Sequence, residues 1–133
     1  QYIKMSNNRQ TYTEGSPWEP IIGYARAVKV GNVIEISGTT ATVNGEVVGK
    51  GDVYEQVKCI LQKFEKVLTE MGASMNDVVR TRIFCTDITQ WEAIGKAHGE
   101  FFSEIKPTTG MYQISKLISD DLLVEIEATA ILS

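Results

Sequence analysis

The chain has 133 residues, of which 43% are hydrophobic and 23% charged, the balance expected of one globular domain over residues 1–133. Thirteen basic and seventeen acidic side chains give a net charge of −4, and no basic stripe stands out, so nucleic-acid binding is not expected. No apolar run could cross a bilayer and no secretory signal pattern is present, so we expect a cytoplasmic protein without membrane contact.

The N-terminus and the cysteines give further limits. The run that begins at Met5 resembles a natural start, so residues 1–4 are expected to be an expression remnant and residues 1–19 an N-terminal arm. Cys59 and Cys85 are too few for a disulfide framework, and no metal-ligand spacing surrounds them. We predict buried free thiols in a reducing compartment, with no metal and no cofactor.

A hairpin is predicted early in the chain. Residues 25–30 alternate small or apolar side chains with polar ones, as a half-buried strand does. Residues 31–32 supply turn chemistry, and residues 33–37 follow as the partner strand. The polar, glycine-bearing residues 38–51 are expected to form a loop with a turn at residues 44–45.

A long helix follows this loop. Asp52 is expected to cap its N-terminus, and Gly72 to end it. Its apolar side chains recur every three or four residues, which is typical of one buried helical stripe. The members of this stripe are Val53, Val57, Ile60, Phe64, Val67 and Met71.

A strand and a second helix come next. Residues 78–86 are rich in β-branched side chains and predict a strand. Asp87 or Thr89 is expected to cap the helix, and Pro107 to end it, because proline disfavours helical geometry in the residue before it. The predicted apolar stripe of this helix is Trp91, Ile94, His98, Phe101 and Ile105.

Two strands, at about residues 110–118 and 122–132, close the chain and complete the order β-β-α-β-α-β-β. Two helices cannot cover both faces of a sheet, so we expect an α+β fold in which both lie on one face of a single mixed sheet. Self-association is expected to cover apolar side chains on the other face. The residues assigned to that face are Ile114, Leu117, Leu123, Ile126 and Ala128.

Six short segments, taken in order and spacing, carry a family resemblance over roughly residues 20 to 132: residues 23–24, 30–38, 72–79, 101–102, 107–114 and 124–128. Together they resemble the reactive intermediate deaminase (Rid) family, also known as the RidA/YjgF or L-PSP endoribonuclease family. The resemblance implies a chorismate-mutase-like fold, a homotrimer, and a cleft for a small-molecule ligand at each subunit interface.

The resemblance also implies a reaction and its residues. Deaminating members hydrolyse imines and enamines to oxo acids and ammonia, which requires a positioned water, proton transfer and a fixed substrate. By resemblance, Glu127 orients the water, Tyr24 and Ser37 line the cleft, and Gly38 lets a ligand approach the backbone. Glu127 and Glu125 share a strand face without a basic neighbour in sequence. Without the resemblance, each residue has an ordinary structural alternative. Glu127 could be an acid on the outer face of a strand, Tyr24 an aromatic packed at a strand start, and Gly38 a turn glycine.

One position departs from the deaminating members, which carry an arginine two residues after the proline to hold the substrate carboxylate. Thr109 stands there, followed by Gly110 and Met111. A guanidinium binds a carboxylate with two hydrogen bonds whereas threonine offers one hydroxyl, so carboxylate binding should weaken by orders of magnitude. Thr109 and the backbone N–H groups of Gly110 and Met111 remain candidates for substrate binding.

Other side chains were considered as substitutes for this arginine. Arg26, Arg80 and Arg82 lie on predicted strands, where solvated or salt-bridged surface positions are favoured over a role in a neighbour's cleft. His98 is the single histidine. Its place on the helical stripe favours a core histidine with one satisfied nitrogen over a catalytic base.

Three functions are compatible with the sequence. The first is a Rid trimer whose clefts bind a small metabolite, either hydrolysing an imine-like or enamine-like substrate with altered specificity or binding without catalysis. The second is a 2-imino acid or enamine deaminase with a substitute arginine. The third is an endoribonuclease, which the acidic composition disfavours.

Overall fold

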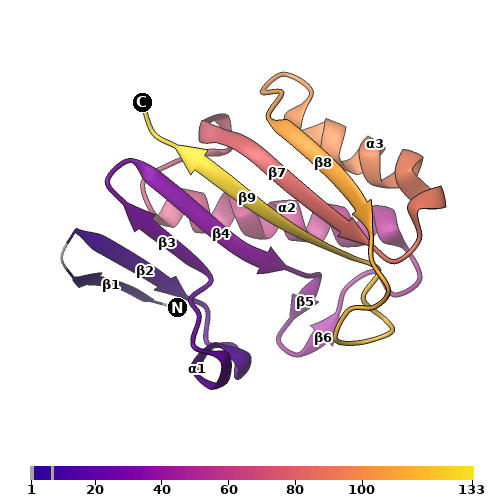
Figure 1. The fold of residues 1–133 in the computed structure, drawn as a ribbon, viewed down its shortest axis with the longest axis horizontal. Coiled ribbons are helices and arrows are strands. Elements are labelled where there is room, and N and C mark those ends of the chain that lie inside the picture. Colours follow the sequence, from indigo (N-terminus) through magenta and orange to yellow (C-terminus); the bar gives the residue numbers. More distant parts are fainter. Residues whose placement is uncertain (1, 7) are drawn as a thin grey trace.

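The computed structural model describes residues 2–6 and 8–133. Seven strands form one sheet in the order β1-β2-β3-β4-β9-β7-β8, and both long helices cover the same face of it (Figure 1). β7 and β8 are parallel, and the other neighbours are antiparallel. The core elements follow the predicted order, which confirms the α+β fold: β3 (Ala27–Val30), β4 (Val33–Thr39), α2 (Val53–Glu70), β7 (Val78–Cys85), α3 (Trp91–Phe102), β8 (Thr108–Gln113) and β9 (Val124–Ile131).

The segment expected to be an N-terminal arm extends the sheet. β1 (Tyr2–Ser6) pairs with β2 (Arg9–Thr13), and β2 pairs with β3, both in antiparallel register. The short helix α1 (Trp18–Ile22) follows and ends at Gly23, whose φ of 89° is in the left-handed region that favours glycine. Tyr24 is therefore delivered directly to the start of the central hairpin.

The central hairpin and the loop after it have the predicted turns. β3 and β4 join through a turn at residues 31–32, with Val30 opposite Val33. The predicted turn at residues 44–45 is also present, with both φ angles positive. It connects two short strands within the predicted loop, β5 (Thr42–Val43) and β6 (Glu46–Val47), which are too short to give a periodic signal.

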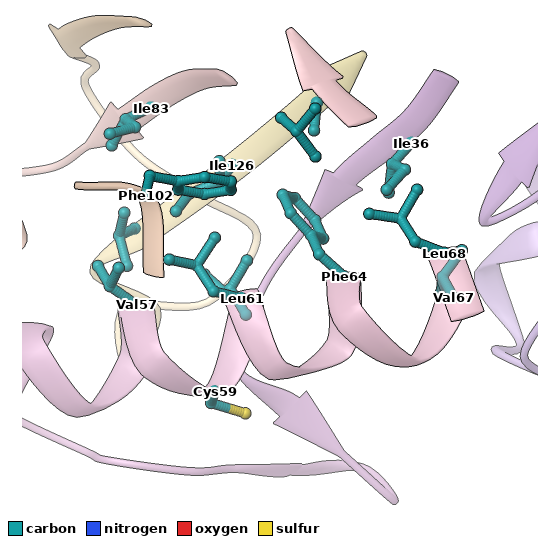
Figure 2. Packing of buried hydrophobic residues seen from close by; sticks show 14 of the residues in the cluster. Ile36, Val57, Cys59, Leu61, Phe64, Val67, Leu68, Ile83, Phe102 and Ile126 are labelled. Carbon is teal, nitrogen blue, oxygen red and sulfur yellow. The ribbon is translucent and has the colours of Figure 1, made fainter. Parts of the chain in front are cut away.

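Helix α2 has the predicted caps and the predicted buried face. The Asp52 side chain accepts the backbone N–H of Glu55 at 3.1 Å, and Gly72 follows the helix with a φ of 83°. All six stripe residues are buried, and Leu61 and Leu68 beside them are buried too, because α2 packs against both the sheet and α3 (Figure 2). Within residues 2–6 and 8–133, no helix is long and apolar enough to span a membrane.

Helix α3 differs from the prediction in its buried face. Short 3-10 turns, Met75–Asp77 and Ile88–Gln90, precede β7 and α3. Ile94 is buried as predicted, but Trp91 is 57% exposed. The other predicted stripe residues, His98, Phe101 and Ile105, are half-buried, and Phe101 and Ile105 pack against the core. Ala97 and Phe102, which the predicted stripe omits, are fully buried. Helix α3 lies behind β8 at the edge of the sheet (Figure 1), so the N-terminal Trp91 has less of the sheet to cover.

The residues predicted for the open face of the sheet are wrong at two positions. Ile126 and Ala128 are fully buried, because alternate residues of β9 point toward the helices. Leu123 is half-buried and packs against the same core. The open face of the central strands carries mainly charged side chains with some large apolar ones, namely Glu35, Arg80, Arg82, Phe84, Tyr112, Glu125, Glu127 and Ile131. Self-association stays a prediction.

Candidate functional site

The predicted site residues fall into two separate groups. Tyr24, Ser37 and Gly38 lie at β4 and just before β3. Residues 109–111 lie on β8, with β9 and β7 between β4 and β8. Neighbouring strands are about 4.8 Å apart, so the two groups are separated by about 14 Å along the sheet. One small ligand cannot contact both groups within a single chain.

Arg26 ties the first group together. The residue is 5% exposed. Nη1 donates to the Gly38 carbonyl at 2.7 Å and to Thr39 Oγ1 at 3.0 Å, and Nη2 donates to the Tyr24 hydroxyl at 3.2 Å. The Ser37 hydroxyl donates separately to the backbone at 2.7 Å. Arg26 therefore fixes the tyrosine and the end of β4 relative to each other.

The charge of Arg26 is part of a buried cluster. Its Nε lies 3.4 Å from Glu14 Oε1, close enough for an ion pair but not aligned for a hydrogen bond. Lys63 Nζ lies 3.7 Å from the same oxygen and donates to the carbonyls of Thr40 and Thr42. Burial lowers the pKa of Lys63. Two cations surrounding one carboxylate make this corner of the molecule attractive to negative charge.

Glu125 is the carboxyl that lies against Gly38. A Cβ added at Gly38 would fall 2.8 Å from Glu125 Cδ, so only glycine leaves room for this carboxyl. Burial raises the pKa of Glu125, the neighbouring Glu127 raises it further, and Arg26 opposes the rise. A carboxyl with a raised pKa close to Gly38 and Arg26 is a candidate acid or base. The structure therefore adds Glu125 and Arg26 to the first group.

Glu127 is placed in an ion pair. Its Oε1 accepts Arg82 Nε at 2.6 Å, and the two side chains are 36% and 26% exposed. Arg82 lies 45 residues away in sequence but directly opposite Glu127 in the β7–β9 register. The sequence around Glu127 contains no basic partner, because its ion-pair partner Arg82 comes from the neighbouring strand β7.

Thr109, in the second group, points toward the helices. Its hydroxyl lies 2.8 Å from that of Thr81, which lies 2.9 Å from Nε2 of His98. His98 thus sits on the inner side of α3 with one ring nitrogen satisfied, as predicted. Burial lowers the pKa of His98. A shallow pocket of about 310 Å³ opens here, lined by His98, Gly99, Phe102, Ser103, Lys106, Pro107 and Thr109.

The other two residues of the second group contribute only backbone to a site. The Met111 side chain packs against the core. Gly110 lies beneath Tyr112, since an added Cβ would overlap the Tyr112 hydroxyl. β8 is last in the strand order, so the outer side of its backbone has no strand partner among the described residues. These N–H and C=O groups are available at the edge of the sheet.

Within one chain, neither Arg26 nor Arg80 nor Arg82 takes the place of the arginine that Thr109 replaces. Arg26 is buried and bonded internally, contrary to the expectation of a surface position. Arg80 and Arg82 point to the open face of the sheet, away from the hydroxyl of Thr109. The Thr109 pocket therefore lacks an arginine of its own chain.

Cys59 and Cys85 are buried free thiols, as predicted. Burial raises the pKa of both thiols, which keeps them protonated and poorly nucleophilic. Over residues 2–6 and 8–133, no group of three or more His, Cys, Asp or Glu side chains is arranged to hold a metal ion. The groups that could carry chemistry at this site are therefore Glu125, Tyr24, Arg26 and the residues of the Thr109 pocket.

Comparisons with known proteins match nearly the whole chain. The family model described as Endoribonuclease L-PSP matches residues 14–132. A RutC family protein from Pyrococcus abyssi is 37% identical over 121 residues, 90% of this chain and 93% of the relative. The 3-aminoacrylate deaminase RutC from Acinetobacter baylyi is 32% identical over 118 residues, 88% and 92% of the two chains. The crystal structure of a YjgF/YER057c/UK114 family member from Mycobacterium tuberculosis superposes with a TM-score of 0.85 at 39% identity, covering 93% and 99%.

Proposed function

Since the chain belongs to the L-PSP endoribonuclease family, also known as the Rid or YjgF family, we propose that it hydrolyses small imines or enamines in clefts between the subunits of a homotrimer. One observation carries the proposal: the half-buried Glu125 carboxyl lies against Gly38, and Arg26 donates hydrogen bonds to both the Gly38 carbonyl and the Tyr24 hydroxyl. The relative named 3-aminoacrylate deaminase supports it, because 3-aminoacrylate is an enamine.

The reaction needs one group that can move protons in both directions. A water oxygen adds to the imine carbon while the Glu125 carboxylate takes one water proton, and the carboxyl then passes this proton to the nitrogen to give a carbinolamine. The carboxylate next takes the hydroxyl proton of the carbinolamine and delivers it to the amine, whose C–N bond breaks to release ammonia and leave a carbonyl. An enamine first takes a proton on carbon. A carboxyl whose raised pKa brings it closer to neutral pH suits both roles.

The inter-subunit cleft follows from the separation of the two groups. Gly38 on β4 is three strand spacings from β8 and Glu125 on β9 is two. Glu125 also lies on the open face of the sheet, whereas Thr109 on β8 points toward the helices, so a shared ligand requires two copies. Tyr112 on β8 and Trp91 on α3 are 49% and 57% exposed, and the outer edge of β8 lacks a strand partner among the described residues. A head-to-tail contact of this kind closes into a ring.

The proposed specificity follows from Thr109. The Thr109 hydroxyl takes the place of an arginine that would make two charge-assisted hydrogen bonds, so an imine that bears a carboxylate is bound weakly. Small imines with other polar groups in place of the carboxylate should therefore compete well with it for the site. RNA cleavage is not proposed, because the net charge of −4 gives a polyanion no attraction. The altered specificity can be tested directly with substrates that differ in charge.

A coupled assay tests the proposal. An amino-acid oxidase generates imines in situ from neutral and acidic amino acids, and the disappearance of free imine is followed with and without the protein. We expect the wild type to accelerate imine loss with a high KM, and Thr109→Arg to lower the KM at least about tenfold by restoring the carboxylate fork. If neither protein accelerates imine loss, the hydrolase proposal fails and a ligand-binding role without catalysis takes its place.

The substitution Gly38→Ala should displace the Glu125 carboxyl, and so lower turnover, without greatly changing the stability of the fold. The three atoms nearest the added methyl group all belong to the flexible end of Glu125, so the free energy of unfolding should change by less than about 1 kcal/mol. Displacing the carboxyl by about 1 Å should lower turnover about 10- to 100-fold. Urea denaturation and the imine assay measure the two effects. When Glu125 is already replaced by alanine, Gly38→Ala should have no further effect on turnover, so the two substitutions should be non-additive; additive losses would contradict this explanation.

A further inference from the structure

The single histidine is connected to the Thr109 pocket by one buried hydroxyl. His98 Nε2 lies 2.9 Å from Thr81 Oγ1, and Thr81 Oγ1 lies 2.8 Å from Thr109 Oγ1. Thr81 is fully buried, whereas Thr109 reaches the pocket surface. The ring of His98 also packs against that of Phe102, with centroids 4.7 Å apart and the planes tilted by 40°, which restricts its orientation. The three polar groups therefore form a short chain that ends where a ligand can bind.

The direction in which the hydrogen bonds run between His98, Thr81 and Thr109 depends on whether Nε2 of His98 carries a proton. When Nε2 carries a proton it donates to Thr81, so the Thr81 hydroxyl donates to Thr109. The Thr109 hydroxyl then donates to the Pro107 carbonyl, which lies 3.4 Å away, or to a ligand that displaces this long contact. When Nε2 is unprotonated it accepts from Thr81, and Thr109 then donates inward and offers only lone pairs to a ligand. Protonation of His98 removes the second arrangement. The ring thereby sets whether Thr109 binds acceptors or donors.

The other lining residues favour an acceptor with negative charge. Lys106 is the only charged side chain besides a protonated His98 that lines the pocket, and Ser103 adds a second hydroxyl. No Asp or Glu is among the lining residues in the part of the chain that the structure describes. A carboxylate uses both hydroxyl donors and the ammonium of Lys106 at once.

We propose that His98, acting through Thr81, holds the Thr109 hydroxyl as a donor to a carboxylate oxygen of the ligand, so that carboxylate binding and protonation of His98 favour each other. Burial lowers the pKa of His98, so the empty pocket holds a neutral ring at neutral pH. A bound carboxylate then raises the pKa of His98, and by linkage its affinity increases as the pH falls. Only the choice of a small carboxylate ligand rests on the proposed function, in which a carboxylate still binds at Thr109 but more weakly than it would to an arginine.

The imidazole proton signals provide the test, because the chain has one histidine. Pyruvate is titrated into the full-length protein at constant ionic strength, at about pH 8 and about pH 6, with acetone as a neutral control that keeps the carbonyl. We expect pyruvate to shift the His98 signals, to raise the pKa of His98, and to bind at least about threefold more tightly at the lower pH. An equal response to acetone, or tighter binding at the higher pH, would overturn the proposal.

Four variants locate the effect. Thr81→Val and Thr109→Val should abolish the pyruvate-dependent change in the pKa of His98, while Thr109→Ser should preserve it. Thr108→Val is the matched control, since Thr108 lies on the same strand but its hydroxyl donates to the Val79 carbonyl. If all four variants behave like the wild type, the effect is nonspecific screening and the relay is rejected. This readout needs no catalysis, so an inactive protein with a positive titration would refute the hydrolase function alone.

Discussion

Glu125→Gln should lower the rate of imine hydrolysis by about 10²- to 10⁴-fold, the usual contribution of a positioned general acid or base. Glutamine keeps the size and the hydrogen-bonding oxygen of the side chain but cannot take a proton from water. The Gly38 backbone and the Tyr24–Arg26 contact are not altered by this change. The coupled assay, run over a range of pH, measures the loss.

The loss of activity should not come from unfolding. The pKa of Glu125 is raised in the folded protein, so its ionised form costs folding free energy above that pKa, and this cost disappears as the pH falls toward the ordinary value. Glutamine carries no charge at any pH. Glu125→Gln should therefore be as stable as the wild type at neutral pH, or slightly more stable, as measured by urea denaturation.

The matching variant Glu127→Gln tests the role that the family resemblance gives to the neighbouring carboxyl. Arg82 holds the Glu127 carboxyl in a partly exposed ion pair, so this carboxyl is already engaged. We expect Glu127→Gln to retain most of the activity. A large loss in Glu127→Gln together with an active Glu125→Gln would reverse the assignment and return the water-orienting role to Glu127.

For wild-type activity, the raised pKa of Glu125 predicts the direction of the pH profile. If the carboxylate form accepts the water proton, the rate falls as the pH drops through the pKa of Glu125, which lies above the ordinary value for glutamate. The Glu125→Gln variant lacks this acidic limb. The limb therefore identifies the titrating group independently of the size of the rate loss.

Local patterns were sufficient to predict most elements of the fold. Asp52 and Gly72 mark the ends of α2 because capping and a left-handed φ are properties of adjacent residues. The open face was harder to predict. Ile126 and Ala128 are apolar at every second position of β9, and only the position of the helices decides which face that alternation covers.

The site was less predictable, because register determines its pairs. Arg26 was expected at the surface, yet the bend before β3 turns it under the end of β4, where Gly38 and Thr39 accept its protons. Arg82 and Glu127 meet only because β7 and β9 are neighbours. Tyr24, Ser37 and Gly38 were found by resemblance, since a tyrosine and a strand-end glycine carry little chemical signal alone.

Arg26→Met should destabilise the protein by about 3–5 kcal/mol, the usual cost of removing one member of a buried charged cluster. Methionine fills the volume but leaves the Gly38 carbonyl, Thr39 Oγ1 and the Tyr24 hydroxyl without their donor, and it leaves Glu14 with Lys63 alone. Urea denaturation of the two proteins measures the change, with the m-value as a check that the unfolding transition remains comparable.

Arg82→Met is the control for this prediction. Arg82 has the same charge and a shorter ion pair than Arg26, but its side chain is 26% exposed, so its removal should cost about 1 kcal/mol or less. The two variants also differ at the site: because Arg26 opposes the rise in the pKa of Glu125, Arg26→Met should move the acidic limb of the rate profile to higher pH. Equal stability losses in both variants would show that the Arg26 network behaves as a surface ion pair, and the fixed Tyr24–Gly38–Glu125 geometry would lose its physical basis.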